Sequence, residues 1–203
     1  MFVALAIGAR VDHASLLLRL DRPVTEFVYA HRSPRLTTLF RRASFLGSTA
    51  VVLTVGSLLA VAAWRRCRLV AAVVVVATLL RPIVEFGLKL AIARPRPSTS
   101  RMVRGIGYSF PSGHMMAAGM LWPLVPVVVS LYAPSRRLWV ATAVVCTTVA
   151  ALVGASRVYL GVHWPTDVLA GALLVGLLLT VLDLELQRIH AGRRCTGQPT
   201  ASR

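Results

Sequence analysis

Immediately before a long apolar run, the chain reads Tyr108-Ser109-Phe110-Pro111-Ser112-Gly113-His114. Pro111 and Ser112 predict the start of a helix, because proline fits a first helical turn and a serine side chain caps free backbone N–H groups. Gly113 has no side chain, so a ligand can approach the backbone closely. The unpaired N–H groups and the positive dipole end of a helix N-terminus favour an anion. His114 would add a titratable imidazole there, although a capped helix start with an incidental histidine has the same sequence.

The composition around this stretch is typical of an integral membrane protein. Hydrophobic residues make up 56% of the 203 residues and charged residues only 15%, a balance that suits one domain with several apolar runs. The formal net charge of +16 could indicate nucleic-acid binding. The arginines, however, lie mainly between apolar runs, as membrane topology and anionic headgroups require. We therefore expect a bilayer as partner and no nucleic acid.

Five apolar runs are long enough to predict membrane spans. They cover residues 49–64, 69–93, 113–131, 138–153 and 164–182. The expected fold is all-α, a polytopic membrane helix bundle of these five spans with two further helices in front of them. Residues 1–9 predict a short, tilted apolar helix. Residues 21–47 mix apolar residues with arginines as an interfacial helix does, and a soluble capping structure is the alternative.

We expect one domain over residues 1–203 in three parts. Residues 1–47 hold the partial and interfacial helices, residues 48–185 hold the bundle with the site, and residues 186–203 form a mobile basic tail. Inside the second apolar run, Arg81 and Glu85 lie four apart on one helix face and can pair. Polar residues within a membrane are functional candidates, and a structural ion pair explains these two equally well.

Upstream of the quoted stretch stands a basic cluster, in which Lys89 is followed by Arg96 and Pro97. Basic residues near a helix end commonly extend toward headgroups, and that explanation suffices for this cluster alone.

Downstream, Ser156 and Arg157 precede His163 and Asp167. His163 and Asp167 lie four apart across a helix start, so the carboxylate can accept the proton of one ring nitrogen and leave the other free to attack. A capping aspartate beside an interfacial histidine explains the pair equally well when it is taken alone.

The span count brings the three clusters together. Two spans separate the loops 94–111 and 154–163, so both loops fall on the same side of the membrane. Guanidinium and ammonium groups match phosphoryl oxygens, and one histidine could attack phosphorus while the other protonates the leaving oxygen. Only Glu85 and Asp167 could supply carboxylates near this face, which is too few for a paired-metal phosphatase. We therefore expect no metal and no cofactor.

The combination Lys-x6-Arg-Pro, Pro-Ser-Gly-His and Ser-Arg-x5-His-x3-Asp resembles the type 2 phosphatidic acid phosphatase family over roughly residues 45–183. The resemblance implies a metal-independent phosphatase in a bundle of membrane helices. It implies that His163 is the nucleophile that forms a phosphohistidine, that Asp167 orients it, and that His114 is the general acid. The residues implied to bind the phosphoryl oxygens are Lys89, Arg96, Ser112, Gly113 and Arg157.

From this resemblance we expect a hydrolase of lipid metabolism that acts on phosphomonoester or diphosphate ends of membrane lipids. Phosphatidate, phosphatidylglycerophosphate and a polyprenyl diphosphate all stay open as substrates. Two alternatives remain, a phosphatase for a small soluble phosphate ester and a non-enzymatic anion-binding membrane protein. Oligomeric state leaves no signal in the sequence.

The distribution of arginines predicts which way the site faces. The loops opposite the site hold Arg65, Arg66, Arg68, Arg136 and Arg137. Basic residues collect on the cytoplasmic side, so we expect a site on the extracytoplasmic side of a bacterial plasma membrane and a C-terminus inside. The arginines of residues 21–47 are set aside because an interfacial helix holds its charges against headgroups.

Overall fold

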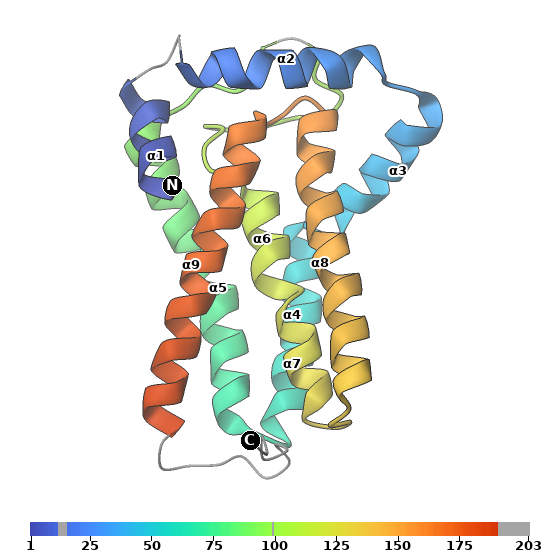
Figure 1. Ribbon diagram of the computed structural model, residues 1–203, viewed down its shortest axis with the longest axis vertical. Coiled ribbons are helices and arrows are strands. Elements are labelled where there is room, and N and C mark those ends of the chain that lie inside the picture. Colours follow the sequence, from blue (N-terminus) through green and yellow to red (C-terminus); the bar gives the residue numbers. More distant parts are fainter. Residues whose placement is uncertain (12–15, 99, 191–203) are drawn as a thin grey trace.

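The computed structural model of the protein describes residues 1–11, 16–98 and 100–190, and every regular element within them is a helix. The helices are α1 (Phe2–Val11), α2 (Leu16–Ala30), α3 (Pro34–Phe45), α4 (Thr49–Trp64), α5 (Arg68–Ile92), α6 (Gly113–Leu121), α7 (Leu124–Ser130), α8 (Arg136–Tyr159) and α9 (Pro165–His190). Figure 1 shows α4 to α9 running along the long axis, with α2 lying crosswise over one end of the bundle.

Four of the predicted spans are long and apolar enough to cross a membrane. They are α5, the pair α6 and α7 taken together, α8, and the first 18 residues of α9. The predicted span over residues 49–64 differs, because α4 has 16 residues and reaches a spanning length only together with α3, to which it is bent by 47°. The bundle thus has four spans, or five when the bent pair α3–α4 is counted as one.

Several boundaries of the spans also differ from the expectation. The third span is broken between α6 and α7, where Pro123 has no backbone N–H to continue the helix. Helix α8 extends to Tyr159, so Ser156 and Arg157 lie in its last turns instead of in the loop. Helix α9 begins at Pro165, as expected, and continues to His190. The predicted tail therefore begins with a helical segment, and residues 191–203 lie outside the described residues.

The segment expected as one interfacial helix is two helices. Ser33 caps α3 by accepting the N–H of Leu36 at 3.3 Å, and this start separates α3 from α2. Leu20, Val24 and Phe27 form an exposed apolar stripe on α2, whereas Asp21 and Thr25 are buried against the bundle. A soluble capping helix would bury the apolar stripe, so this arrangement favours a helix whose apolar side contacts lipid.

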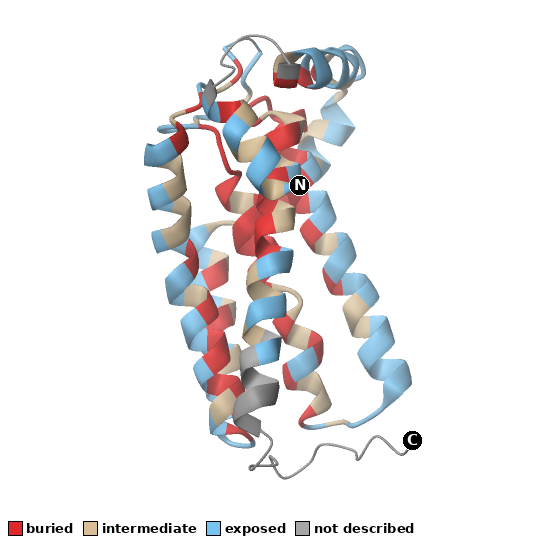
Figure 2. Cartoon of the chain, turned by 60° about the vertical axis from the view of Figure 1, so that its left-hand side comes forward, coloured by how far each residue is buried: buried red, intermediate tan, exposed pale blue. Residues whose placement is uncertain are grey.

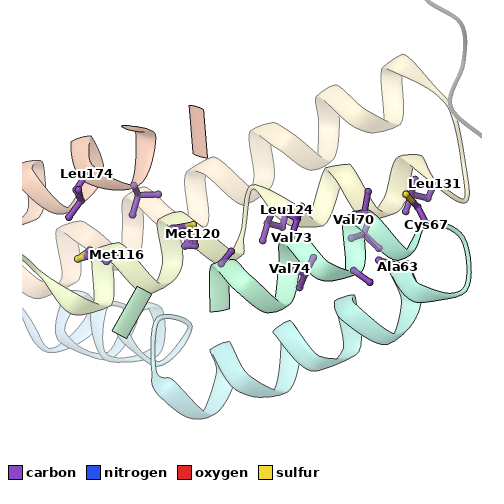
Figure 3. Packing of buried hydrophobic residues seen from close by; sticks show 14 residues of the cluster. Ala63, Cys67, Val70, Val73, Val74, Met116, Met120, Leu124, Leu131 and Leu174 are labelled. Atoms are coloured by element: carbon purple, nitrogen blue, oxygen red, sulfur yellow. The ribbon is translucent and has the colours of Figure 1, made fainter. Parts of the chain in front are cut away.

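The largest cluster of buried hydrophobic residues lies along the half of the bundle away from α2. Its buried residues come from α4 to α7 and α9, and Figure 3 shows them meeting between these helices. The labelled members are Ala63, Cys67, Val70, Val73, Val74, Met116, Met120, Leu124, Leu131 and Leu174. In Figure 2, buried residues also gather in the loops beneath α2, where the polar residues lie. The core therefore holds the helices in place beneath a buried polar end.

Candidate active site

All three sequence clusters meet at the end of the bundle covered by α2. They line a cavity of about 810 Å³. The predicted site residues that line it are Lys89, Arg96, Gly113, His114, Arg157 and His163. Ser112 and Asp167 are fully buried behind this wall. The loops expected on one membrane side are joined directly, since Met102 N–H donates to the carbonyl of Leu160 at 3.0 Å.

The helix start expected at the quoted stretch is present, with one difference. Ser112 is the N-cap of α6, but its hydroxyl makes no capping hydrogen bond, and it has no partner among the described residues. Its backbone N–H instead donates to the carbonyl of Asp167 at 3.1 Å. The second and third clusters are therefore tied together through the main chain.

Two fixed partners decide which nitrogen of His163 carries the proton. Nε2 lies 3.0 Å from Nη1 of Arg96, and a guanidinium can only donate. Nδ1 lies 2.7 Å from the carbonyl oxygen of Ser109, which can only accept. The neutral ring therefore carries its proton on Nδ1 and has its lone pair on Nε2. Nε2 is the nitrogen on the side of the cationic residues of the cavity.

Asp167 contacts His163 less closely than the spacing of the two residues predicts. Its Oδ2 lies 3.6 Å from Nδ1, which is longer than a hydrogen bond. Oδ2 accepts the N–H of Trp164 at 2.9 Å, and Oδ1 accepts from Arg94 at 2.6 Å. The carbonyl of Ser109 thus accepts the Nδ1 hydrogen bond that was expected for Asp167. The Asp167 carboxylate still lies close enough to interact electrostatically with a charged imidazole.

A buried charge network behind Asp167 was not predicted. Arg94 donates through Nη1 to Asp167 and through Nη2 to Oδ2 of Asp21, at 2.6 and 2.7 Å. Asp21 also accepts the N–H and the hydroxyl of Thr166, at 2.9 and 2.7 Å. All four of these side chains are buried. The only sign of this contact in the sequence was that Asp21 is an acidic residue in a strongly basic N-terminal segment.

Ser109 belongs to the same wall. Its hydroxyl donates to the carbonyls of Arg94 and Pro95, at 3.1 and 3.0 Å, and its N–H donates to Arg94 at 2.8 Å. These hydrogen bonds hold the segment before Pro111 against the segment after α5. The Ser109 carbonyl is thereby aimed at His163, a role that belongs to the main chain and leaves no side-chain signal.

The cationic side chains of the cavity differ in how many of their N–H donors already have a partner within the protein. Arg96 donates to the carbonyls of Ile106, Gly107 and Val162, at 2.7 to 2.9 Å. Arg157 donates through Nη1 to the hydroxyl of Ser44 at 2.5 Å, and its Nε has no partner among the described residues. Lys89 pairs with Glu85 at 2.8 Å, and the predicted pair of Arg81 with Glu85 is present at 2.5 Å.

The surroundings of His163 keep its ring neutral. Burial lowers the pKa of His163 to about 4, because a desolvated imidazole is costly to charge. The Asp167 carboxylate opposes this shift, and the positive charges of Arg96 and Arg157 add to it. At neutral pH the ring therefore holds an unprotonated Nε2, which is the form that can act as a nucleophile.

A family model described as the PAP2 superfamily matches residues 70–187, which is more than half of the chain. The chain belongs to the PAP2 superfamily. The family resemblance of the three motifs is thereby confirmed, and all three lie within the matched residues. The acidic, basic and histidine residues described above are thus the polar end of a PAP2 helix bundle.

Curated relatives of this PAP2 protein are named as phosphatases. It is 41% identical over 100 residues to phosphatidylglycerophosphatase B of Bacillus subtilis (strain 168), a match that spans 47% of each chain. It is 36% identical over 103 residues to phosphatidylglycerophosphatase B of Escherichia coli (strain K12), covering 47% of this chain and 35% of the relative. It is 36% identical over 80 residues to undecaprenyl-diphosphatase of Sulfolobus acidocaldarius, covering 39% and 34%. The matches span less than half the length of these relatives.

Solved structures extend the likeness to most of the chain. A transmembrane PAP2 type phosphatidylglycerolphosphate phosphatase from Bacillus subtilis superposes with a TM-score of 0.85 and 26% identity, over 95% of both chains. LpxE of Aquifex aeolicus superposes with a TM-score of 0.63 and 24% identity, over 82% of this chain and 95% of that one. The second likeness concerns the fold alone. The apolar helices and these membrane relatives show that this PAP2 chain is an integral membrane protein.

Proposed function

We propose that the protein hydrolyses terminal phosphate or diphosphate groups of membrane lipids through a phosphohistidine on His163. The observation that carries this proposal is the lone pair of Nε2, which lies on a cavity wall lined by Lys89, Arg96 and Arg157. Preorganised cations in a water-poor site stabilise the charge that develops on a transferred phosphoryl group. The phosphatase names of the curated relatives support the same reaction class.

The first step forms a bond between Nε2 of His163 and phosphorus and breaks the bond from phosphorus to the lipid oxygen. Arg96 must release Nε2 for this attack, and its guanidinium then becomes a donor for the phosphoryl oxygens. His114 gives a proton to the leaving lipid oxygen. The Asp167 carboxylate and the Ser109 carbonyl stabilise the charge that the phosphorylated ring acquires.

In the second step, a water molecule attacks phosphorus and the nitrogen–phosphorus bond breaks. His114 takes the proton of that water, which returns both histidines to their starting forms and releases inorganic phosphate. No metal ligand is needed in either step. Within the described residues, no three histidine, cysteine, aspartate or glutamate side chains lie together as a metal site would require.

The walls of the cavity favour a lipid over a small soluble ester. Away from the cations, the cavity is lined by Leu53 of α4 and by Leu79, Phe86 and Leu90 of α5. The same four side chains are exposed on the outside of the bundle, between 49% and 65%. In a bilayer these positions contact acyl chains, so a lipid can place its phosphate at the cations while its tail stays in the membrane.

The test is phosphate release by purified protein from phosphatidate, phosphatidylglycerophosphate and a polyprenyl diphosphate in mixed micelles, with a soluble phosphate ester alongside. His163→Ala should lose on the order of a thousandfold or more of the turnover, as enzymes do without their nucleophile. Activity should survive a chelator and should be inhibited by orthovanadate. Brief reaction with radiolabelled substrate should leave an acid-labile, alkali-stable label on wild-type protein.

Each alternative has its own outcome in this test. Substantial activity of folded His163→Ala would refute the nucleophile, and activity that magnesium restores after chelation would refute the metal-free reaction. Preference for the soluble ester would refute the lipid assignment. Phosphate binding without turnover on any substrate would leave a non-enzymatic anion-binding protein.

A further inference from the structure

A carboxylate lies among the cations of the cavity. Glu85 of α5 lines the same cavity as His114 and His163. Its Oε1 pairs with Nζ of Lys89 at 2.8 Å, and its Oε2 pairs with Nη1 of Arg81 at 2.5 Å. Both partners are four residues away on α5, one on each side. An acidic group is unexpected in a site that is built to bind an anion.

The carboxylate also lies against the start of α6. A Cβ atom at Gly113 would overlap the Oε1 and Cδ atoms of Glu85. Gly113 is the first residue of α6, where unpaired N–H groups and the dipole favour a negative group. Glu85 therefore occupies the space between Lys89 and Gly113, two of the residues assigned above to the phosphoryl oxygens. The absence of a side chain at Gly113 makes that space available.

We propose that Glu85 is a built-in occupant of the phosphoryl-binding site, displaced by substrate, that keeps the diester headgroups of ordinary phospholipids out of the cavity. This inference rests on the proposed function. A carboxylate and a phosphoryl group offer the same kind of oxygen acceptors, so they compete for Lys89 and for the start of α6. Every ligand that binds there must move Glu85, and this cost is the same for all of them.

A constant cost excludes weak ligands and admits strong ones. A terminal phosphate carries up to two negative charges and three free oxygens. It can therefore use the donors of Lys89, Arg96 and Arg157 together. A diester headgroup has one charge and two free oxygens, so it gains less from the same cations. Because diesters surround the cavity in a bilayer, a site without Glu85 would fill with them.

The experiment measures equilibrium binding of inorganic phosphate by calorimetry, in a detergent without phosphate groups. Glu85→Gln should bind phosphate at least about tenfold more tightly than the wild type. Two negative groups placed side by side repel each other, and this repulsion lowers the phosphate affinity of the wild type by more than about tenfold. With phosphate set at the same multiple of its Kd for each protein, one fixed content of phosphatidylglycerol in the micelles should displace phosphate from Glu85→Gln and leave it bound to the wild type. The matched control is Glu26→Gln, which removes an exposed carboxylate on α2 and should bind as the wild type does.

Arg81 loses its partner in Glu85→Gln, so a second comparison covers a variant that fails to fold. Arg81→Gln combined with Glu85→Gln should bind phosphate more tightly than Arg81→Gln alone. If phosphate binding is unchanged or weaker in either comparison, Glu85 only positions Lys89. If phosphate binds more tightly but phosphatidylglycerol does not displace it, the exclusion of diesters is refuted. These readouts do not need turnover. A protein that binds phosphate and hydrolyses nothing would refute the proposed function alone, and an active enzyme with unchanged Glu85→Gln binding would refute this inference alone.

Discussion

His163 combines an unprotonated Nε2 with a low pKa, and both follow from its neighbours. The Ser109 carbonyl holds the proton on Nδ1, and Arg96 donates to Nε2. Burial and the nearby guanidinium groups make the charged ring unfavourable, so the pKa of His163 is about 4. The ring is therefore neutral over the whole neutral pH range, and in the proposed reaction it attacks phosphorus once Arg96 has turned from Nε2 to the phosphoryl oxygens.

This arrangement predicts the pH dependence of Arg96→Gln. The positive charge of Arg96 lowers the pKa of His163, so its removal raises that pKa toward the ordinary value of about 6.5. Attack needs the neutral ring, and the acid-side fall of kcat/KM should therefore move to higher pH than in the wild type. The measurement is a pH profile of both proteins on one substrate, so that the substrate's own ionisation is common to both.

Arg104→Gln is the control for this shift, because Arg104 lines the cavity whereas the cations that lower the pKa of His163 are Arg96 and Arg157. Its profile should keep the midpoint of the wild type. An acid-side limb that stays in place in Arg96→Gln, or that moves equally in both variants, would contradict the role given to the Arg96 charge.

At the scale of the helices, the site depends on close approaches between elements. A Cβ atom at Gly47, between α3 and α4, would lie 2.5 Å from Cγ1 of Val153 and 3.0 Å from the carbonyl oxygen of His114. The glycine thus lets the start of α4 approach both α6 and α8. Each of those helices carries one motif of the cavity, so this contact helps to set the distance between motifs.

Gly47→Ala should therefore destabilise the protein by about 1–3 kcal/mol, as overpacking does, and should lower activity. Gly87→Ala on α5 is the matched control, since nothing lies within 4 Å of a Cβ there and alanine favours a helix. The measurements are thermal unfolding in detergent and phosphate release. Equal behaviour of the two variants would show that the contact at Gly47 can relax without cost.

Asp21 links helix α2 to the site. Asp21 accepts the N–H of Thr166 in the first turn of α9, and Arg94 connects the same carboxylate to Asp167. Asp21→Asn removes one charge from this buried network and should cost about 3 kcal/mol, as breaking a buried pair does. We expect kcat to fall more than KM rises, because Asp21 positions the wall behind His163 and does not touch the cavity.

Melting temperature, kcat and KM are measured for Asp21→Asn beside Arg22→Gln, whose side chain is exposed on the same turn of α2. A loss of stability with unchanged kcat in the folded fraction would assign Asp21 a purely structural role. A wild-type melting temperature would show that the network tolerates the missing charge.

At the scale of the whole molecule, we expect the cavity to face the extracytoplasmic side of the membrane. Helix α2 lies at one end of the bundle, and the arginine-rich connections α4–α5 and α7–α8 lie at the other end (Figure 1). The cavity lies toward the α2 end, because Arg96, His114 and His163 line it. The positive-inside tendency then places the cavity outside the cytoplasm. In a functional background without the native cysteines, Ser98→Cys should react with an impermeant thiol reagent in intact cells, and Ser135→Cys should react only after lysis.

Both positions are exposed in the structure, so a failure to react reports the membrane side and not burial. Labelling of Ser135→Cys in intact cells, with Ser98→Cys protected, would place the reaction at the cytoplasmic leaflet.

The sequence alone determined the features that depend on neighbouring residues or on counting. The apolar runs predicted the helix bundle, because the length and hydropathy of a span are local properties. The number of spans between the loops placed the three motifs on one side. Six of the motif residues line one cavity, namely Lys89, Arg96, Gly113, His114, Arg157 and His163, and their roles stay predictions. The break of α3–α4 and the length of α9 were missed, because helix ends depend on contacts with other elements.

Only the tertiary structure decided how the histidine is held and where the acidic groups lie. The acceptor for Nδ1 is a main-chain carbonyl, and any residue type carries such a group. The partner of Thr166 is Asp21, 145 residues away, and no periodic pattern connects them. Glu85 looked like half of an ion pair along α5, and its contact with Gly113 exists only because α5 and α6 pack together. These contacts depend on how the helices pack, which the spacing of residues along the chain does not specify.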